Sequence, residues 1–60
     1  MFNERYFRDR EHFNQWYKNV TIMGVRNIIG FIRKYDVYVE SSDYRKPGWY
    51  YYVSWVEEEE

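Results

Sequence analysis

The sequence contains no cysteine, and His12 is its only histidine. Disulfides and thiolate metal sites are therefore excluded, as is a zinc site built from several histidines. A domain of 60 residues buries only about 60% of its unfolded surface and is marginal without a staple. Large side chains and oligomerisation remain as sources of stability, so we expect self-association, most simply as a homodimer.

Leucine and alanine are also absent, although they are the best apolar helix formers. Ile, Val and fifteen aromatic residues (eight Tyr, four Phe and three Trp) take their place. These residue types fit strands better than helices, so the composition predicts substantial β content.

Long apolar runs and targeting signals are missing as well. No run approaches the roughly 20 residues that a membrane-spanning helix needs. The N-terminal segment MFNERYFRDR is charged, unlike a signal peptide. We therefore expect a cytoplasmic protein with no membrane partner.

Catalytic patterns are not visible either. The sequence has no Gly-rich phosphate loop, nucleophile elbow or metal-ligand spacing. His12 follows Asp9 by three residues, but no cysteine can serve it as a nucleophile, and the serines fall in a predicted hairpin. A chain this short also makes a poor enclosed pocket. We expect no enzymatic activity and no cofactor.

Charge is unevenly distributed, although the net charge is only −1. Residues 1–34 contain seven basic and three acidic side chains, whereas residues 35–60 contain two basic and seven acidic ones. Such asymmetry indicates contacts with a partner, or else a solvated basic helix and an acidic tail at 57–60. The Glu run would either discourage edge-to-edge aggregation of the preceding strand, which we favour, or dock on a basic partner.

Residues 3–18 have the pattern of an amphipathic helix that Asn3 would cap. Asp9 falls inside the apolar stripe, where it is either a boundary residue or a group aimed at a partner. The first interpretation is favoured. The stripe consists of Phe2, Tyr6, Phe13, Trp16, Tyr17 and Val20.

Residues 19–35 allow two interpretations. The period predicts a second helix over 25–35 after a break near Gly24, and we favour this one. The β-branched composition instead predicts strands, in which Gly24 and Gly30 would mark bends or bulges. Glycine inside a helix costs about 1 kcal/mol relative to alanine.

Residues 36–57 predict an antiparallel β-hairpin. DVYVES alternates, SDYRKPG contains turn residues, and WYYYVSWVE has strand composition. In the second strand, alternation places Trp49, Tyr51, Val53 and Trp55 on one face and Tyr50, Tyr52, Ser54 and Val56 on the other. Both faces are largely apolar, and 60 residues can hardly cover both.

The uncovered face of that strand is the candidate contact surface, because Tyr and Trp dominate binding hot spots. Burial of both tryptophans with Val53 would leave Tyr50 and Tyr52 outward, with their hydroxyls in water. These two tyrosines are the favoured contact residues. The full candidate set is Tyr38, Trp49, Tyr50, Tyr51, Tyr52 and Trp55.

The segment MGVRNIIGFI at 23–32 resembles the turn and recognition helix of the winged helix-turn-helix family. Gly24 would lie at the turn, and Arg26 and Asn27 at the start of the reading helix. The resemblance implies nucleic-acid binding, with the hairpin tip over phosphate. The residues that would contact nucleic acid are Arg26, Asn27, Arg33, Lys34, Arg45 and Lys46.

Together these patterns predict a single small α+β domain over residues 1–60. It has an N-terminal amphipathic helix, a second element that is either helix or strands, and a C-terminal hairpin. We expect it to bind and modulate a larger macromolecule, most simply a protein, as phage and mobile-element inhibitors or regulators do. The alternative is a small winged helix-turn-helix-like regulator that binds nucleic acid.

Overall fold

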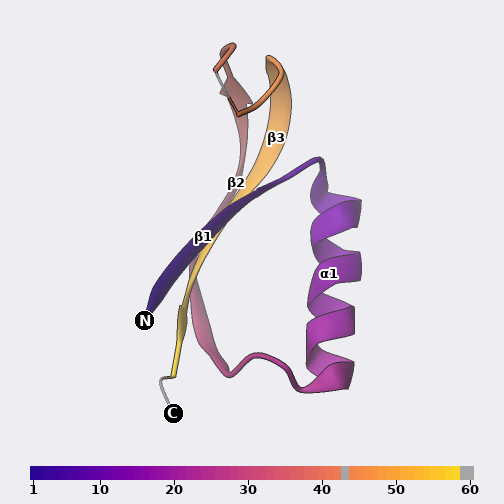
Figure 1. Cartoon of the computed structure of the whole chain (residues 1–60), viewed down its shortest axis with the longest axis vertical. Coiled ribbons are helices and arrows are strands. Elements are labelled where there is room, and N and C mark those ends of the chain that lie inside the picture. Colours follow the sequence, from indigo (N-terminus) through magenta and orange to yellow (C-terminus); the bar gives the residue numbers. More distant parts are fainter. Residues whose placement is uncertain (43, 59–60) are drawn as a thin grey trace.

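The computed structural model describes residues 1–42 and 44–58. Over these residues the chain forms one helix and three strands, in the order β1 (Phe2–Phe7), α1 (Arg10–Met23), β2 (Ile28–Val39) and β3 (Gly48–Glu57). The sheet is antiparallel with the order β1-β3-β2, so β3 is central. The α+β class is confirmed, and Figure 1 shows α1 along one side of the sheet.

The N-terminal segment is a strand, so the prediction of a helix over 3–18 is wrong for residues 3–9, whereas residues 10–18 do belong to α1. Phe2–Phe7 pairs with β3, from Phe2↔Val56 to Phe7↔Tyr51. Three of its six residues are aromatic, which favours a strand. Phe2 and Tyr6 are four residues apart, a spacing that places two residues on one face of a helix or of a strand, so the stripe alone could not distinguish the two.

Helix α1 begins after Asp9, which is its N-cap in place of the predicted Asn3. The Asp9 backbone is extended, and its Oδ1 accepts a hydrogen bond from the His12 N–H at 2.8 Å. The helix ends at Gly24, whose φ of 63° lies in the left-handed region. The Gly24 N–H donates to the carbonyl of Val20 at 3.0 Å, which satisfies one of the last carbonyls of the helix.

Residues 28–39 form β2, so the second-helix prediction for 25–35 is wrong and the strand alternative is correct. The register shifts between Ile28 and Gly30, as that alternative expected near Gly30, and again between Phe31 and Arg33. Each extra residue interrupts the alternation of side chains along the strand. This interruption explains why the apolar period resembled that of a helix.

The C-terminal hairpin is confirmed, and its first strand begins earlier than predicted. β2 and β3 pair from Ile28↔Glu57 to Val39↔Gly48. With 28–39 in a strand, the recognition helix expected within 23–32 does not form. Arg26 and Asn27 instead lie in the connection between α1 and β2.

The hydrophobic core lies between α1 and the sheet. Its buried residues are Phe7, Phe13, Tyr51, Val53 and Trp55, and Trp16, Ile28 and Phe31 pack against them. Phe13 of the helix lies 5.3 Å from Phe7 and 5.5 Å from Tyr51 between ring centroids, and Trp16 lies 5.0 Å from Trp55. The predicted core face is therefore confirmed for Val53 and Trp55, but wrong for Trp49, which is exposed.

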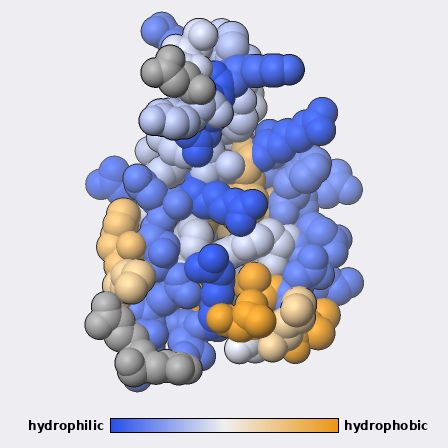
Figure 2. Space-filling model, viewed as in Figure 1, coloured by the Kyte–Doolittle hydropathy of each residue, from blue (hydrophilic) through white to orange (hydrophobic). Residues whose placement is uncertain are grey.

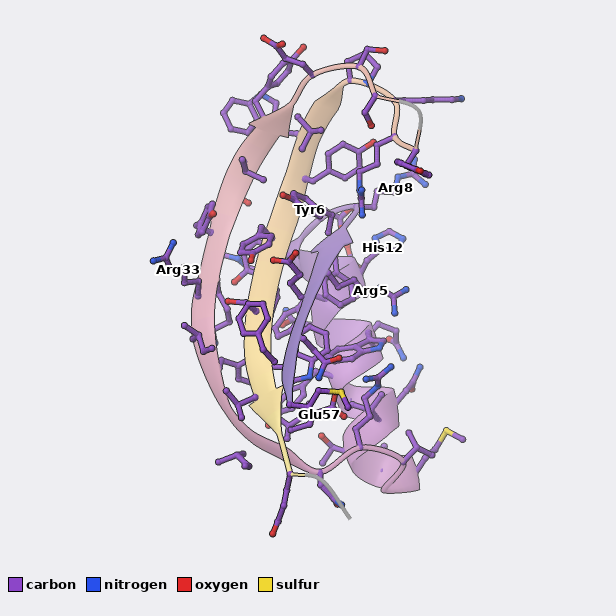
Figure 3. The ribbon with its side chains drawn as sticks, turned by 60° about the vertical axis from the view of Figure 1, so that its left-hand side comes forward. Arg5, Tyr6, Arg8, His12, Arg33 and Glu57 are labelled. Carbon is purple, nitrogen blue, oxygen red and sulfur yellow. The ribbon has the colours of Figure 1, made fainter. Side chains whose placement is uncertain are left out.

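The opposite face of the sheet, here called the open face, carries no helix or strand of the described residues, and Figure 3 shows the strands in front of α1. Pairing across β1, β3 and β2 arranges its side chains in three rows. The rows are Phe2–Val56–Gly30, Glu4–Ser54–Arg33 and Tyr6–Tyr52–Tyr35. Tyr6 and Tyr35 lie 5.0 Å and 5.1 Å from Tyr52 between ring centroids.

Candidate protein-binding site

The far end of the hairpin projects beyond the rest of the molecule. Phe7↔Tyr51 is the last pair between β1 and β3, whereas β2 and β3 continue to Val39↔Gly48. Figure 1 shows this two-stranded end extending past α1 and past the end of β1. We call residues 37–42 and 44–50 the arm.

Three large aromatic side chains of the arm are exposed to solvent. The exposed fractions are 53% for Tyr38, 89% for Tyr44 and 69% for Trp49. Tyr38 and Trp49 face each other across the two strands, edge to face, with ring centroids 5.7 Å apart. Neither α1 nor β1 extends far enough along β3 to cover this pair. Trp49 is therefore exposed although it shares a face with Trp55.

Hydrogen bonds within the loop fix the backbone that carries Tyr44. The Ser42 Oγ accepts from the N–H groups of Tyr44 and Arg45, at 3.4 Å and 3.2 Å. The Ser42 N–H donates to the carbonyl of Arg45 at 3.2 Å. A side chain presented by an ordered loop loses less conformational entropy on binding than one on a flexible loop.

Basic groups surround the base of the arm. The Arg45 guanidinium lies 4.4 Å from the centroid of the Tyr6 ring, and that of Arg10 lies 5.4 Å from the Tyr51 ring. Both are cation–π distances. Two guanidinium groups therefore stack on aromatic rings at the base of the arm.

Two of the predicted contact residues have structural roles instead. Tyr51 and Trp55 are buried in the core beneath α1. The Trp55 Nε1–H donates to the Glu57 carboxylate at 3.0 Å, and this carboxylate also pairs with Arg26 at 2.9 Å. Only Glu57 and Glu58 of the expected acidic tail are described, and Glu57 belongs to β3; residues 59–60 lie outside the described residues.

The favoured contact residues, Tyr50 and Tyr52, do not leave their hydroxyls in water as expected. The Tyr52 side chain is buried between Tyr6 and Tyr35, and its Oη donates to the Glu4 carboxylate at 2.5 Å. This hydrogen bond raises the pKa of Tyr52, and burial adds to the effect. Tyr50 is half-buried, and its Oη donates to the Lys46 carbonyl at 2.7 Å. Tyr38 and Trp49 are thus the predicted residues that remain accessible.

Sequence reasoning missed Tyr44 as a contact candidate. The signal that could have found it is an aromatic residue inside a segment of turn residues, SDYRKPG. An aromatic side chain at a hairpin turn has few neighbours to bury it. Its exposure therefore follows from its position between the two strands.

The basic residues proposed for nucleic-acid contact do not form one surface. Arg26, in the α1–β2 connection, forms an ion pair with Glu57 of β3, whereas Arg45 and Lys46 lie in the arm. Arg33 projects from the open face (Figure 3), but Lys34 lies on the helix side, 5.1 Å from the Phe31 ring. Asn27 stands beside Arg26, and its carbonyl accepts from the Glu58 N–H at 2.9 Å.

His12 and Asp9 form an exposed pair at the start of α1. The His12 Nδ1 lies 2.7 Å from the Asp9 Oδ1, and this hydrogen bond is the main cause of a lowered pKa of Asp9. Within the described residues, no three His, Asp or Glu side chains are grouped so that they could hold a metal ion. The pair therefore caps the helix, and it has no third ligand among those residues.

The comparisons with known proteins do not extend this description. No family model, no curated protein and no solved structure matches the chain. The one helix that is described, α1, is too short and too polar to span a membrane.

Proposed function

We propose that this protein is a non-enzymatic binding module whose arm contacts a larger protein and modulates it. The observation that carries the proposal is the exposure of Tyr38, Tyr44 and Trp49 on a projecting, internally bonded hairpin. Tyr and Trp supply much contact area with few rotatable bonds, and they dominate binding hot spots. The three side chains are the contact residues in this proposal.

In this proposal the protein is an inhibitor or regulator of the kind that phages and mobile elements encode, acting in the cytoplasm. A body of 7.7 kDa has little room for an enclosed active site beside its core. Such a protein acts by occupying a surface or groove of its target. The arm has the shape for this role, since it extends past the helix-covered body (Figure 1).

The direct test is a capture experiment with the tagged chain as bait in nuclease-treated lysate of the source cell. We expect the wild-type chain to retain a specific protein, and a variant with Tyr38→Ala, Tyr44→Ala and Trp49→Ala to lose it. Tyr50 and Tyr52 stay unchanged, because their hydroxyls hold Lys46 and Glu4. Circular dichroism must show the same fold for both chains.

The matched control lies at the opposite end of the molecule. Ile22, Met23 and Val25 are equally exposed apolar residues at the end of α1, and Figure 2 shows hydrophobic surface gathered there. Changing these three to alanine should leave the captured protein bound. Retention by the arm variant, or loss in the control variant alone, would contradict the proposal.

A further inference from the structure

The open face has the composition of an interface but no partner within the described residues. Phe2 and Tyr35 are exposed on it, and Val56 and Tyr6 are only half-buried. Sheets with one apolar face are stable when a second layer covers that face. The described residues supply no such layer on this side of the sheet, so a second molecule could provide it.

The two sides of this face differ in a systematic way. On the β1 side, the three rows carry the large Phe2, the negative Glu4 and the ring of Tyr6. On the β2 side, the same rows carry Gly30, Arg33 and Tyr35. In each row the two sides are therefore complementary. The large Phe2 is matched by a glycine, the negative Glu4 by a positive arginine, and the Tyr6 ring by a second tyrosine ring.

We propose that the open face binds the open face of a second copy of this chain, about a two-fold axis that runs along β3. Rotation about such an axis exchanges the two sides of the face and keeps each row at its own height. Every β1 side chain then lies over the β2 residue of the same row in the other copy. The result is a sandwich of two sheets with α1 on each outer side.

The bulky residue and the glycine fit one another in this arrangement. Apart from Gly30 itself and its two chain neighbours, no heavy atom of the same chain lies within 4 Å of a Cβ added at Gly30, so no other residue fills this space. Phe2 of the second copy, which is 58% exposed in the single chain, enters that space. The two-fold axis forms this contact twice.

The charges also favour this axis. Glu4 uses Oε2 to accept the Tyr52 hydroxyl, which leaves Oε1 to receive a guanidinium. Arg33 makes no ion pair with any described carboxylate and points outward (Figure 3). A two-fold axis across the strands, centred on Ser54, would instead place Glu4 over Glu4 and Arg33 over Arg33, and like charges in an interface are costly.

The third row and the area are consistent with the same contact. At the arm end, Tyr35 of one copy meets Tyr6 of the other and the Arg45 guanidinium that stacks on Tyr6. A stable interface takes about 800 Å² from each partner. This is about a sixth of the 4970 Å² that the single chain exposes.

The dimer can be tested by reversing the charge of Glu4 or Arg33 and measuring the molecular mass by light scattering and sedimentation. We expect the wild-type mass to be twice 7.7 kDa, and Glu4→Arg and Arg33→Glu each to weaken the dimer by about 100-fold or more. The double variant, and an equimolar mixture of the two single variants, should recover it. Lys18→Glu on the exposed side of α1 is the control and should stay dimeric.

A second variant guards against loss of the fold. A Cβ at Gly30 meets no residue beyond its chain neighbours, so we expect Gly30→Trp to remain folded by circular dichroism and to become monomeric. At about 100 μM, a dimer with a Kd near 10 μM would be the main species. A wild-type chain that is monomeric at this concentration would overturn the proposal. A dimer that persists in both single charge variants and in Gly30→Trp would overturn it too, because it would use another surface.

Discussion

The two faces of β3 reach the same low exposure by different means. On the helix side, Val53 and Trp55 are 0% and 2% exposed because α1 lies over them. On the open face, Tyr52 and Ser54 are 8% and 1% exposed although no described element lies above them. There the neighbouring strands provide the cover, with the rings of Tyr6 and Tyr35 on either side of Tyr52.

The difference shows that low exposure on a central strand does not by itself indicate a covering layer. The helix side excludes water with packed rings from all four elements, so its stability depends on apolar area. The open face depends on pairwise ring contacts and on one hydroxyl–carboxylate hydrogen bond. We therefore expect substitutions on the two faces to differ in size and in pH dependence.

Trp55→Ala is expected to have the largest effect. Truncation of a buried tryptophan costs about 3–5 kcal/mol, and a core of this size rarely supplies more than about 3–5 kcal/mol in total. The variant should be largely unfolded by far-UV and near-UV circular dichroism.

The same change at Trp49, six residues earlier on the same side of β3, is the matched control. Trp49 is exposed on the arm, so Trp49→Ala should change the free energy of unfolding by less than about 0.5 kcal/mol. Equal losses at the two positions would contradict the assignment of the core to the helix-covered part of the strand.

Tyr35→Ala should have an intermediate effect, because it removes one ring from the Tyr6–Tyr52–Tyr35 row. Cross-strand aromatic pairs contribute about 0.2–1 kcal/mol, and we expect a loss in that range in urea unfolding of the dilute protein. Tyr44→Ala removes a ring of the same type from the arm and should leave stability unchanged. If Tyr44→Ala costs as much as Tyr35→Ala, the row does not shield Tyr52.

An alkaline titration distinguishes the open face from the helix side. The pKa of Tyr52 is raised above 10.0 by the hydrogen bond to Glu4 and by burial. The protonated hydroxyl is therefore favoured in the folded state. Its contribution to stability is complete below pH 10 and is lost as the pH rises through the folded-state pKa. Tyr52→Phe should unfold with a weaker dependence on pH in this range, and an unchanged dependence would show that the hydroxyl is not the responsible group.

Asp9→Asn should produce the smallest effect, and it concerns a part of the helix outside both faces. Asparagine caps helices as well as aspartate does, so stability near pH 7 should change little. The pKa of Asp9 is lowered below 3.8 by His12, so its contribution is present above pH 3.8 and is lost as the pH falls through the folded-state pKa. Acid unfolding of Asp9→Asn should be less steep than that of wild type.

The hairpin was predictable from the sequence because its signals are local. Alternation and turn residues lie within one segment, and the structure confirms β3 over Gly48–Glu57. Strand β1 was not predictable in this way, because its identity depends on pairing between Phe2 and Val56 at opposite ends of the chain. Strand β2 was not predictable because its two bulges interrupt the alternation of apolar and polar residues.

The predictions for the contact residues differ in the same way: those that depend on local alternation are correct, and those that depend on distant elements are not. Alternation assigned Tyr51, Val53 and Trp55 to one face of the strand, and their burial follows from α1. No local rule states how far α1 reaches along that face, so the exposure of Trp49 could not be derived. The burial of Tyr52 could not be predicted either, because it depends on Tyr6 lying in a neighbouring strand.

The position of β3 in the sheet also constrains how the chain can fold. β1 and β2 are each hydrogen-bonded to β3 and not to one another, and β3 follows both of them in the sequence. Neither strand has a pairing partner until residues 48–57 arrive between them, so loop-closure entropy is lost before any ladder compensates for it. Removal of β3 would thus abolish the whole sheet, and we expect folding to be a single cooperative event without a stable half-formed sheet.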